Sequence, residues 1–188
     1  MTISTTGLQG SLLASHPRLD RRDPFSETVI YLYKHDHDGS AGLILNQPTD
    51  YTFQDICAEK GIYSNIDCEV RQGGPVGLTQ CTLLHTSEWF SSSTRALDNR
   101  LAISSDDGML ERLADGDEPA YWRIFVGYCG WAPGQLAEEM NGEPPYRPEH
   151  SWLVSDYSDE LAFLEDEKSQ WQACLDSAAS KVFNPYFA

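Results

Sequence analysis

Short apolar runs separated by turn-forming residues fill the first part of the chain, and this spacing restricts the fold more than any other feature. Runs rich in β-forming residues occupy positions 10–15, 27–34 and 41–46. Each run is bounded by residues typical of turns, and the stretch HDHDGS joins the second run to the third. Because this connection is short and rich in turn residues, the two runs are predicted to form an antiparallel hairpin.

The rest of the chain mixes helix and strand signals. Thr52 and Asp55 resemble a capping box, which predicts a helix that ends near Gly61. Ser104 or Ser105 is predicted to cap a second helix, through residue 113. Further strands are predicted over 68–72, 79–85, 99–104, 121–128 and 151–155, and further helices over 135–140, 158–167 and 168–183.

These elements predict an α+β protein with a largely antiparallel sheet. The strands come in runs rather than in strict alternation with helices, which argues against a doubly wound fold. Hydrophobic residues make up 40% of the 188 residues, enough for a sizeable core. The length predicts a single domain over residues 1–188.

The charge of the chain restricts its partners. Twenty-nine acidic residues against 13 Lys and Arg give a formal net charge of −16. Polyanions such as nucleic acids and anionic membranes attract basic surfaces, so direct binding to nucleic acid and to membranes is not expected. The N-terminal sequence lacks the basic and apolar regions of a signal peptide, which predicts a cytoplasmic location.

The stretch FVGYCGWAPGQLAEEM (125–140) allows two interpretations. Cys129 could be a nucleophile at the start of a helix, since a helix N-terminus lowers a thiol pKa. Alternatively, Gly127 and Gly130 permit a sharp strand-to-helix corner, and Cys129 is its small residue. Aromatic neighbours and the acidic helix favour the corner, so no catalytic residue is predicted.

Two other stretches carry possible site chemistry. The alternating residues from His35 to Asp38 could hold a metal, but an acidic turn needs none, and no metal site is predicted. Gly73 and Gly74 precede Pro75 and could present amides to a phosphate, yet no helix or basic residue follows, which favours a turn. No cofactor is predicted. The acidic pairs elsewhere are typical of solvated helix faces.

The order of several blocks resembles the YqgE/AlgH family, a bacterial group often labelled as transcriptional regulators. The blocks are GSLLASHPRLDRRDPFSETVIYLYKHDHDGSAGLILNQP, QGGPV, a Leu-His pair, GYCGWAPGQLAEEM and WLV, between residues 7 and 155. The resemblance implies an α+β fold whose sheet is bent into a barrel-like shape with peripheral helices. Cys129, where the family typically has a small residue such as Ala, and the linker NGEPPYRPEH depart from the usual pattern.

The resemblance brings no established catalytic site. Among the positions that match it, His35, Asn46 and Gln135 are the polar ones. The leading hypothesis is a non-catalytic regulatory or interaction domain that binds a protein partner; the chain is not expected to be an enzyme. The alternative is a small-ligand-binding protein or an enzyme with a cleft near those three polar residues. The candidate ligand- or partner-binding residues are His35, Asn46, Gly73, Gly74, Tyr128, Trp131 and Gln135.

Overall fold

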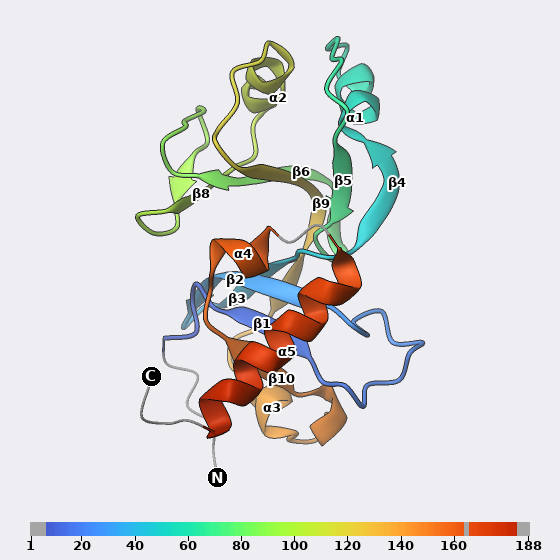
Figure 1. The fold of residues 1–188 in the computed structure, drawn as a ribbon, viewed down its shortest axis with the longest axis vertical. Helices are drawn as coiled ribbons and strands as arrows, with labels where there is room; N and C mark the ends of the chain where they lie inside the picture. The colour runs from blue at the N-terminus through green and yellow to red at the C-terminus, as the bar shows by residue number, and fades with distance from the viewer. Residues whose placement is uncertain (1–6, 164–165, 184–188) are drawn as a thin grey trace. The chain divides into compact units, whose positions relative to one another are not determined.

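The computed structural model describes residues 7–163 and 166–183. Contacts within the chain divide it into two compact units (Figure 1). The first unit contains the residues up to Gln47 and those from Cys129 onward, and the second unit runs from Pro48 to Tyr128. The expectation of one domain over residues 1–188 stays a prediction.

An antiparallel sheet and the helices that cover it form the first unit. The strands are ordered β10-β1-β2-β3, and β3 pairs with the last residues of β9. The elements of this unit are β1 (Leu12–Ser15), β2 (Val29–Asp36), β3 (Gly39–Ile44), β9 (Trp122–Trp131, shared with the second unit), α3 (Gln135–Asn141), η1 (Pro148–His150), β10 (Trp152–Ser155), α4 (Asp159–Ala162) and α5 (Glu167–Phe183).

The core of the first unit lies between this sheet and its helices. Helix α5 crosses β1 and β10 (Figure 1). The spacing of Trp171, Cys174, Leu175 and Ala178 predicts a buried stripe; three of these residues are buried, and Leu175 is half-buried. The indole Nε1 of Trp171 donates to the carbonyl of Ser15 at 3.0 Å, which satisfies a polar group in the buried interface.

A second group of strands and two short helices form the second unit. The strand order is β4-β5-β9-β6-β8-β7; β5 and β9 are parallel and the other pairs are antiparallel. The elements are β4 (Pro48–Thr52), α1 (Phe53–Glu59), β5 (Glu69–Gln72), β6 (Val76–Thr86), β7 (Arg95–Ala96), β8 (Leu101–Ser104), α2 (Asp107–Ala114) and β9. Its core includes Phe53, Cys57, Val70, Leu83, Leu110 and Ile124.

Most local predictions are confirmed. The fold is α+β with a mostly antiparallel sheet, and β2 and β3 form the predicted hairpin. The capping box is present, since the Thr52 hydroxyl accepts from Asp55 N–H and the Asp55 carboxylate accepts from Thr52 N–H at 2.8 Å. The predicted cap of α2 is wrong by one or two residues. Asp106 caps this helix, because its carboxylate accepts from Met109 N–H while Ser104 belongs to β8.

The predicted corner at Gly127–Gly130 is also wrong, because β9 continues to Trp131. Cys129 pairs with Gly42 of β3, and the chain leaves the sheet only afterwards, at Gly134, whose φ is 81°. Strand β9 is longer than predicted because it pairs with two strands in succession. It pairs with β5 as far as Val126 and with β3 from Cys129.

Gly127 is required within β9 for two physical reasons. Its φ is 72°, which side chains disfavour, and a Cβ there would collide with the carbonyl oxygen of Gly74. This crowding arises because β6 bulges: Val76 pairs with Tyr128 but Cys81 pairs with Val126, so four residues of β6 lie opposite Gly127 alone.

Replacing Gly127 with Ala is expected to destabilise the second unit more than the same change at Gly61. Gly61 has a similar φ of 73° but open space around its Cα, so G61A introduces only backbone strain, about 1 kcal/mol. G127A adds displacement of the β6 bulge, a further 1–3 kcal/mol or so. Urea unfolding followed by circular dichroism measures both, and equal losses would contradict the crowding argument.

Candidate functional site

The structure places His35 and Asn46 at opposite ends of the β2–β3 hairpin. His35 pairs with Ser40 near the turn, and its Nδ1 lies 2.7 Å from the Ser40 hydroxyl. Asn46 follows β3 and accepts from Val29 N–H at 2.8 Å. Six residues of extended β2 separate Val29 from His35, about 20 Å at 3.3 Å per residue. The structure therefore does not bring these two side chains into one cleft.

The polar atoms of Asn46 are occupied by the fold. Besides accepting from Val29, its amide donates to the carbonyls of Glu27 and Glu167 at 2.8 and 3.1 Å. The side chain is buried and ties the end of β3 to the segment before β2 and to the start of α5. This is a structural use of a buried amide, which must find partners for its donors and acceptor.

Gln135 and Trp131 belong to one hydrogen-bond network. Gln135 accepts from Ala132 N–H at 2.9 Å and donates to the carboxylate of Glu139 at 3.0 Å. The other oxygen of Glu139 accepts from the indoles of Trp131 and Trp152, both at 2.9 Å. Both indoles are buried, with ring planes at 86° to one another. Trp131 and Trp152 therefore present little aromatic surface to a partner.

Cys129 lies in the core of the first unit beneath this network. Burial, with a contribution from the Glu139 carboxylate, raises the pKa of its thiol to about 12. A thiol with such a pKa is protonated at neutral pH and is a poor nucleophile. Cys129 is therefore a buried packing residue within β9 rather than the small residue of a corner.

The potential metal ligands of the β2–β3 turn are exposed. Asp36, His37 and Asp38 offer ligand atoms within 4.8 Å of one another, the only such group in the part of the chain that the structure describes. All three come from one turn, and the Asp36 carboxylate is already engaged by the backbone N–H of Asp38 at 2.9 Å. Exposed acidic groups are common in this geometry without a metal.

Gly73, Gly74 and Tyr128 lie together in the second unit, at the bulge of β6. Gly73 N–H donates to the carbonyl of Val126 at 2.8 Å, and both glycines are buried. A Cβ at Gly77 would lie 3.1 Å from the Tyr128 ring, so the bulge rests on that ring. These residues position the bulge and the side chain it presents, Leu78.

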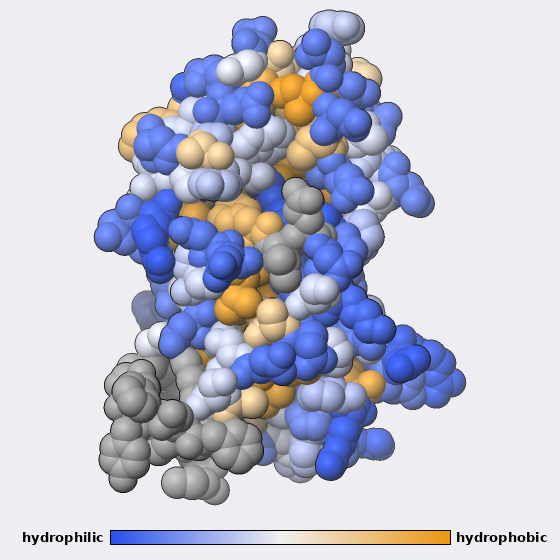
Figure 2. All heavy atoms as spheres, in the orientation of Figure 1, coloured by the Kyte–Doolittle hydropathy of each residue, from blue (hydrophilic) through white to orange (hydrophobic). Residues whose placement is uncertain are grey.

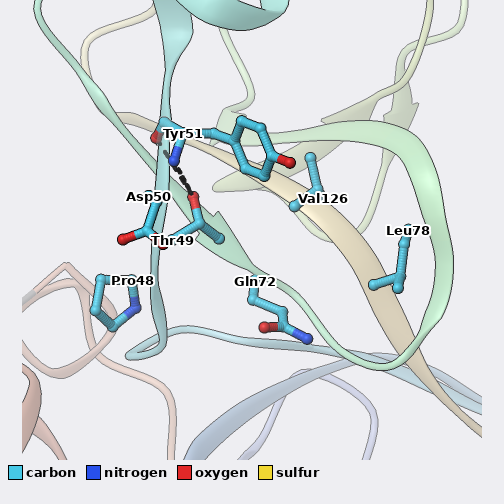
Figure 3. A pocket seen from close by; sticks show the side chains of 7 residues that line it. All are labelled: Pro48, Thr49, Asp50, Tyr51, Gln72, Leu78 and Val126. Atoms are coloured by element: carbon cyan, nitrogen blue, oxygen red, sulfur yellow. Dashed lines mark hydrogen bonds between the residues drawn. The ribbon is translucent and has the colours of Figure 1, made fainter.

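Leu78, Tyr51 and Val126 separate two adjoining hollows in the surface of the second unit. The first hollow, about 540 Å³, is also lined by Pro48, Thr49 and Gln72, and Figure 3 shows Tyr51, Leu78 and Val126 around it. The second hollow, about 410 Å³, lies between α1 and α2. We call the two hollows together the Tyr51–Leu78 groove. Figure 2 shows apolar side chains exposed between α1 and α2.

The groove combines apolar residues with an acidic rim. Tyr51 and Leu78 are each 57% exposed, and both line the two hollows. Ile56, Cys81, Met109 and Leu110 line the second hollow, and its charged residues are Glu59, Lys60, Asp106 and Asp107. Lys60 Nζ lies 2.8 Å from a carboxylate oxygen of Asp107, which links α1 to α2 across the hollow.

A buried polar chain joins β6 to β8. His85 Nδ1 donates to the Thr86 carbonyl at 2.9 Å, and His85 Nε2 therefore accepts from the Ser104 hydroxyl at 3.0 Å. Burial lowers the pKa of His85, which keeps the ring neutral. A Ser–His pair is the arrangement of an activated nucleophile, but the exposed fractions of Ser104 and His85 are 1% and 0%, so no substrate reaches them.

Asp106 anchors the neighbouring loop to the start of α2. Burial opposes its ionisation, but hydrogen bonds from Ser91 and Ser93 outweigh that effect and lower the pKa of Asp106 to about 2. The carboxylate receives the two serine hydroxyls at 2.6 Å each. It also accepts from Met109 N–H at 3.1 Å, so one charge fixes the helix and the loop together.

Comparisons with known proteins agree with the order of the sequence blocks. The family DUF179, described as AlgH-like, matches residues 12–182. The chain is 35% identical to a UPF0301 protein of Paracoccus denitrificans over 182 residues, covering 92% of this chain and 90% of the relative. A UPF0301 protein of Methylococcus capsulatus is 33% identical over 172 residues, with 90% of each chain covered.

This chain belongs to the AlgH-like family. Among solved structures, it is similar to the solution structure of the AlgH protein from Pseudomonas aeruginosa, with a TM-score of 0.74 and 27% identity over 97% of this chain and 96% of that one. A crystal structure of a Corynebacterium diphtheriae protein shares the fold, with a TM-score of 0.65, 20% identity and coverage of 87% and 83%. These likenesses confirm the family resemblance and the α+β class.

Sequence reasoning missed the most exposed residues of the groove in this AlgH-like chain. Leu78 falls between the turn predicted at Gly73–Pro75 and the strand predicted over 79–85, and Tyr51 directly precedes a helix cap. Each is a single apolar residue in a polar stretch, and periodicity does not mark such residues.

Among the residues that the structure describes, no helix is long and apolar enough to span a bilayer.

Replacing Glu139 with Ala is expected to lower the free energy of unfolding by about 2–4 kcal/mol, since two buried indoles lose a charged acceptor. Glu138, exposed on the same helix, is the matched control, and E138A is expected to change stability by less than about 0.5 kcal/mol. Urea unfolding followed by tryptophan fluorescence measures both. Equal effects at the two positions would show that the network contributes nothing.

Cys129 is expected to resist iodoacetamide at pH 8 in the folded protein, because its pKa of about 12 leaves the thiol protonated and its exposed fraction is 2%. In urea the same residue is expected to react fully. Mass spectrometry of the digested protein measures labelling at each cysteine. Rapid labelling of Cys129 in the native state would revive the nucleophile hypothesis.

Proposed function

We propose that this AlgH-like chain is a non-catalytic interaction module that holds a short segment of a partner protein in the Tyr51–Leu78 groove. The observation that carries the proposal is the exposure of Tyr51 and Leu78, 57% each, beside hollows of about 540 and 410 Å³. Large apolar side chains lining a surface hollow are the usual anchors of peptide recognition.

The position of Leu78 supports a dedicated site. Leu78 lies on a bulge of β6 that requires Gly127 and packs on the Tyr128 ring. Its exposure is therefore a result of the strand pairing and not of an irregular loop. Bulges of this kind re-aim side chains next to functional sites. The predicted candidates Gly73, Gly74 and Tyr128 then act as positioning residues of the groove.

The alternative of a small-ligand-binding protein or enzyme has less support. It requires His35, Asn46 and Gln135 in one cleft, and the hydrogen bonds of Asn46 and Gln135 are spent on the fold. Any regulatory role in the cytoplasm would, on this proposal, be exercised by binding a protein. The net charge of −16 disfavours direct contact with DNA.

Panning a phage-displayed library of random dodecapeptides on the intact protein tests the proposal. Selected peptides are expected to lose affinity by at least about tenfold for Y51A and for L78A, because each change removes an apolar anchor. The matched control is Tyr63→Ala in the same unit, where the tyrosine is 87% exposed and does not line the groove. Fluorescence anisotropy gives Kd for each variant.

Thermal melting confirms that each variant is folded. Both anchors are more than half exposed, so their removal is expected to leave Tm within a few degrees of the wild-type value. If no peptide is selected, or if the selected peptides bind Y51A and L78A as well as the wild type, the proposed function is wrong.

A further inference from the structure

We propose that the segment held in the Tyr51–Leu78 groove is cationic: it places an apolar side chain in the hollow between α1 and α2 and an adjacent Lys or Arg on the acidic rim. The inference rests on the proposed function and adds the chemistry of the partner. Two features of the second hollow carry it, namely the depth of its apolar lining and the balance of its charges.

The lining of the second hollow suits an apolar side chain. Met109 and Leu110 of α2 are 1% exposed and belong to the core, and Ile56 of α1 packs against the same core. A side chain that enters the hollow therefore meets the core of the second unit directly. Burial of an aliphatic or aromatic group there gains about 25 cal/mol per Å² of apolar area.

The charges around this hollow favour a cation beside that anchor. Its lining includes the carboxylates of Glu59, Asp106 and Asp107 but a single cation, Lys60. Asp106 is occupied by the serine loop and Asp107 by Lys60, while Glu59 is exposed at the end of α1. Lys60 is the C-cap of α1, so the one cation of the lining lies at the negative end of that helix.

The same charges disfavour the other occupants. Nucleic acids and anionic lipid surfaces are negatively charged, as the rim is, and would be repelled by it. A second copy of this chain carries a formal net charge of −16, so self-association through this surface is opposed as well. A basic partner segment is attracted to the rim and also to the protein as a whole, which raises its association rate at low salt.

Lys60 occupies the place that the partner's cation would take. Its ammonium holds Asp107 at 2.8 Å, yet the two side chains are 48% and 70% exposed, so the pair is weak and open to competition. Removing this lysine leaves the rim more negative. A cationic segment should then bind more tightly, whereas a segment held by apolar contacts alone should not respond.

The test uses peptides selected from the library and measures Kd by anisotropy. Selected peptides are expected to be enriched in Lys and Arg next to an aliphatic or aromatic residue. E59Q and D107N are expected to weaken binding by about 2- to 5-fold each, and K60Q to strengthen it by a similar factor. These differences are expected to shrink when NaCl is raised from low concentration to about 1 M, where the screening length is about 3 Å.

Asp67→Asn is the matched control, because Asp67 is exposed in the same unit, lies outside the lining of the groove, and its replacement changes the net charge by the same amount. It is expected to leave Kd unchanged within about 1.5-fold at moderate salt. Because Glu59 ends a helix, where a negative charge is unfavourable, E59Q should not destabilise the fold.

The outcomes separate the two proposals. Peptides that depend on Tyr51 and Leu78 but contain no Lys or Arg, or that bind K60Q no better than the wild type, overturn the cationic inference alone. Loss of affinity in D67N equal to that in E59Q overturns it too, because the effect would then be one of overall charge. Absence of any groove-dependent peptide overturns the proposed function itself.

Discussion

Strand β9 has to provide hydrogen-bond partners for three other strands, and it changes partner in the middle of its length. It pairs with β5 as far as Val126, with β6 as far as Tyr128, and with β3 from Cys129. Gly127 stands at the change, with a positive φ and with no room for a side chain beneath the Gly74 carbonyl. The bulge of β6, and through it the position of Leu78, depends on that single absent Cβ.

The Tyr51–Leu78 groove is therefore a consequence of how the sheet of the second unit is paired. The bulge turns Leu78 out to solvent, β4 supplies Tyr51, and α1 and α2 form the walls of the second hollow. Asp106 holds the start of α2 in place through its cap and its two serine donors. Because these hydrogen bonds already order the lining, it loses less conformational entropy when a segment binds than a mobile loop would.

The polar residues of the family motifs serve the fold of this AlgH-like chain. Asn46 satisfies a backbone amide and two carbonyls, and Gln135 orients the carboxylate that receives two buried indoles. A buried polar group without a partner lowers the stability of the fold, so the fold requires these side chains for its stability. A motif of polar and aromatic residues can thus be specific for a family because it stabilises the family's fold.

Features that depend on local physics could be predicted from the sequence. The hairpin of β2 and β3, the capping box at Thr52 and Asp55, the buried stripe of α5 and the α+β class follow from patterns within a few residues. The formal net charge of −16, from which we predict that polyanionic partners do not bind, is also a property of composition. The family could be identified from ordered blocks of residues before any coordinates were known.

Which side chains lie together depends on long-range strand pairing, which the sequence patterns do not show. Whether β9 turns at Gly127 or continues to Trp131 depends on strands that are distant in sequence, and local propensity carries no information about them. His35 and Asn46 were candidates for one cleft. They are separated because they lie at opposite ends of the β2–β3 hairpin. Tyr51 and Leu78 belong to no hydrophobic pattern in the sequence. They line one hollow because β4 and the bulge of β6 border it. Long-range pairing, rather than local sequence, creates the site.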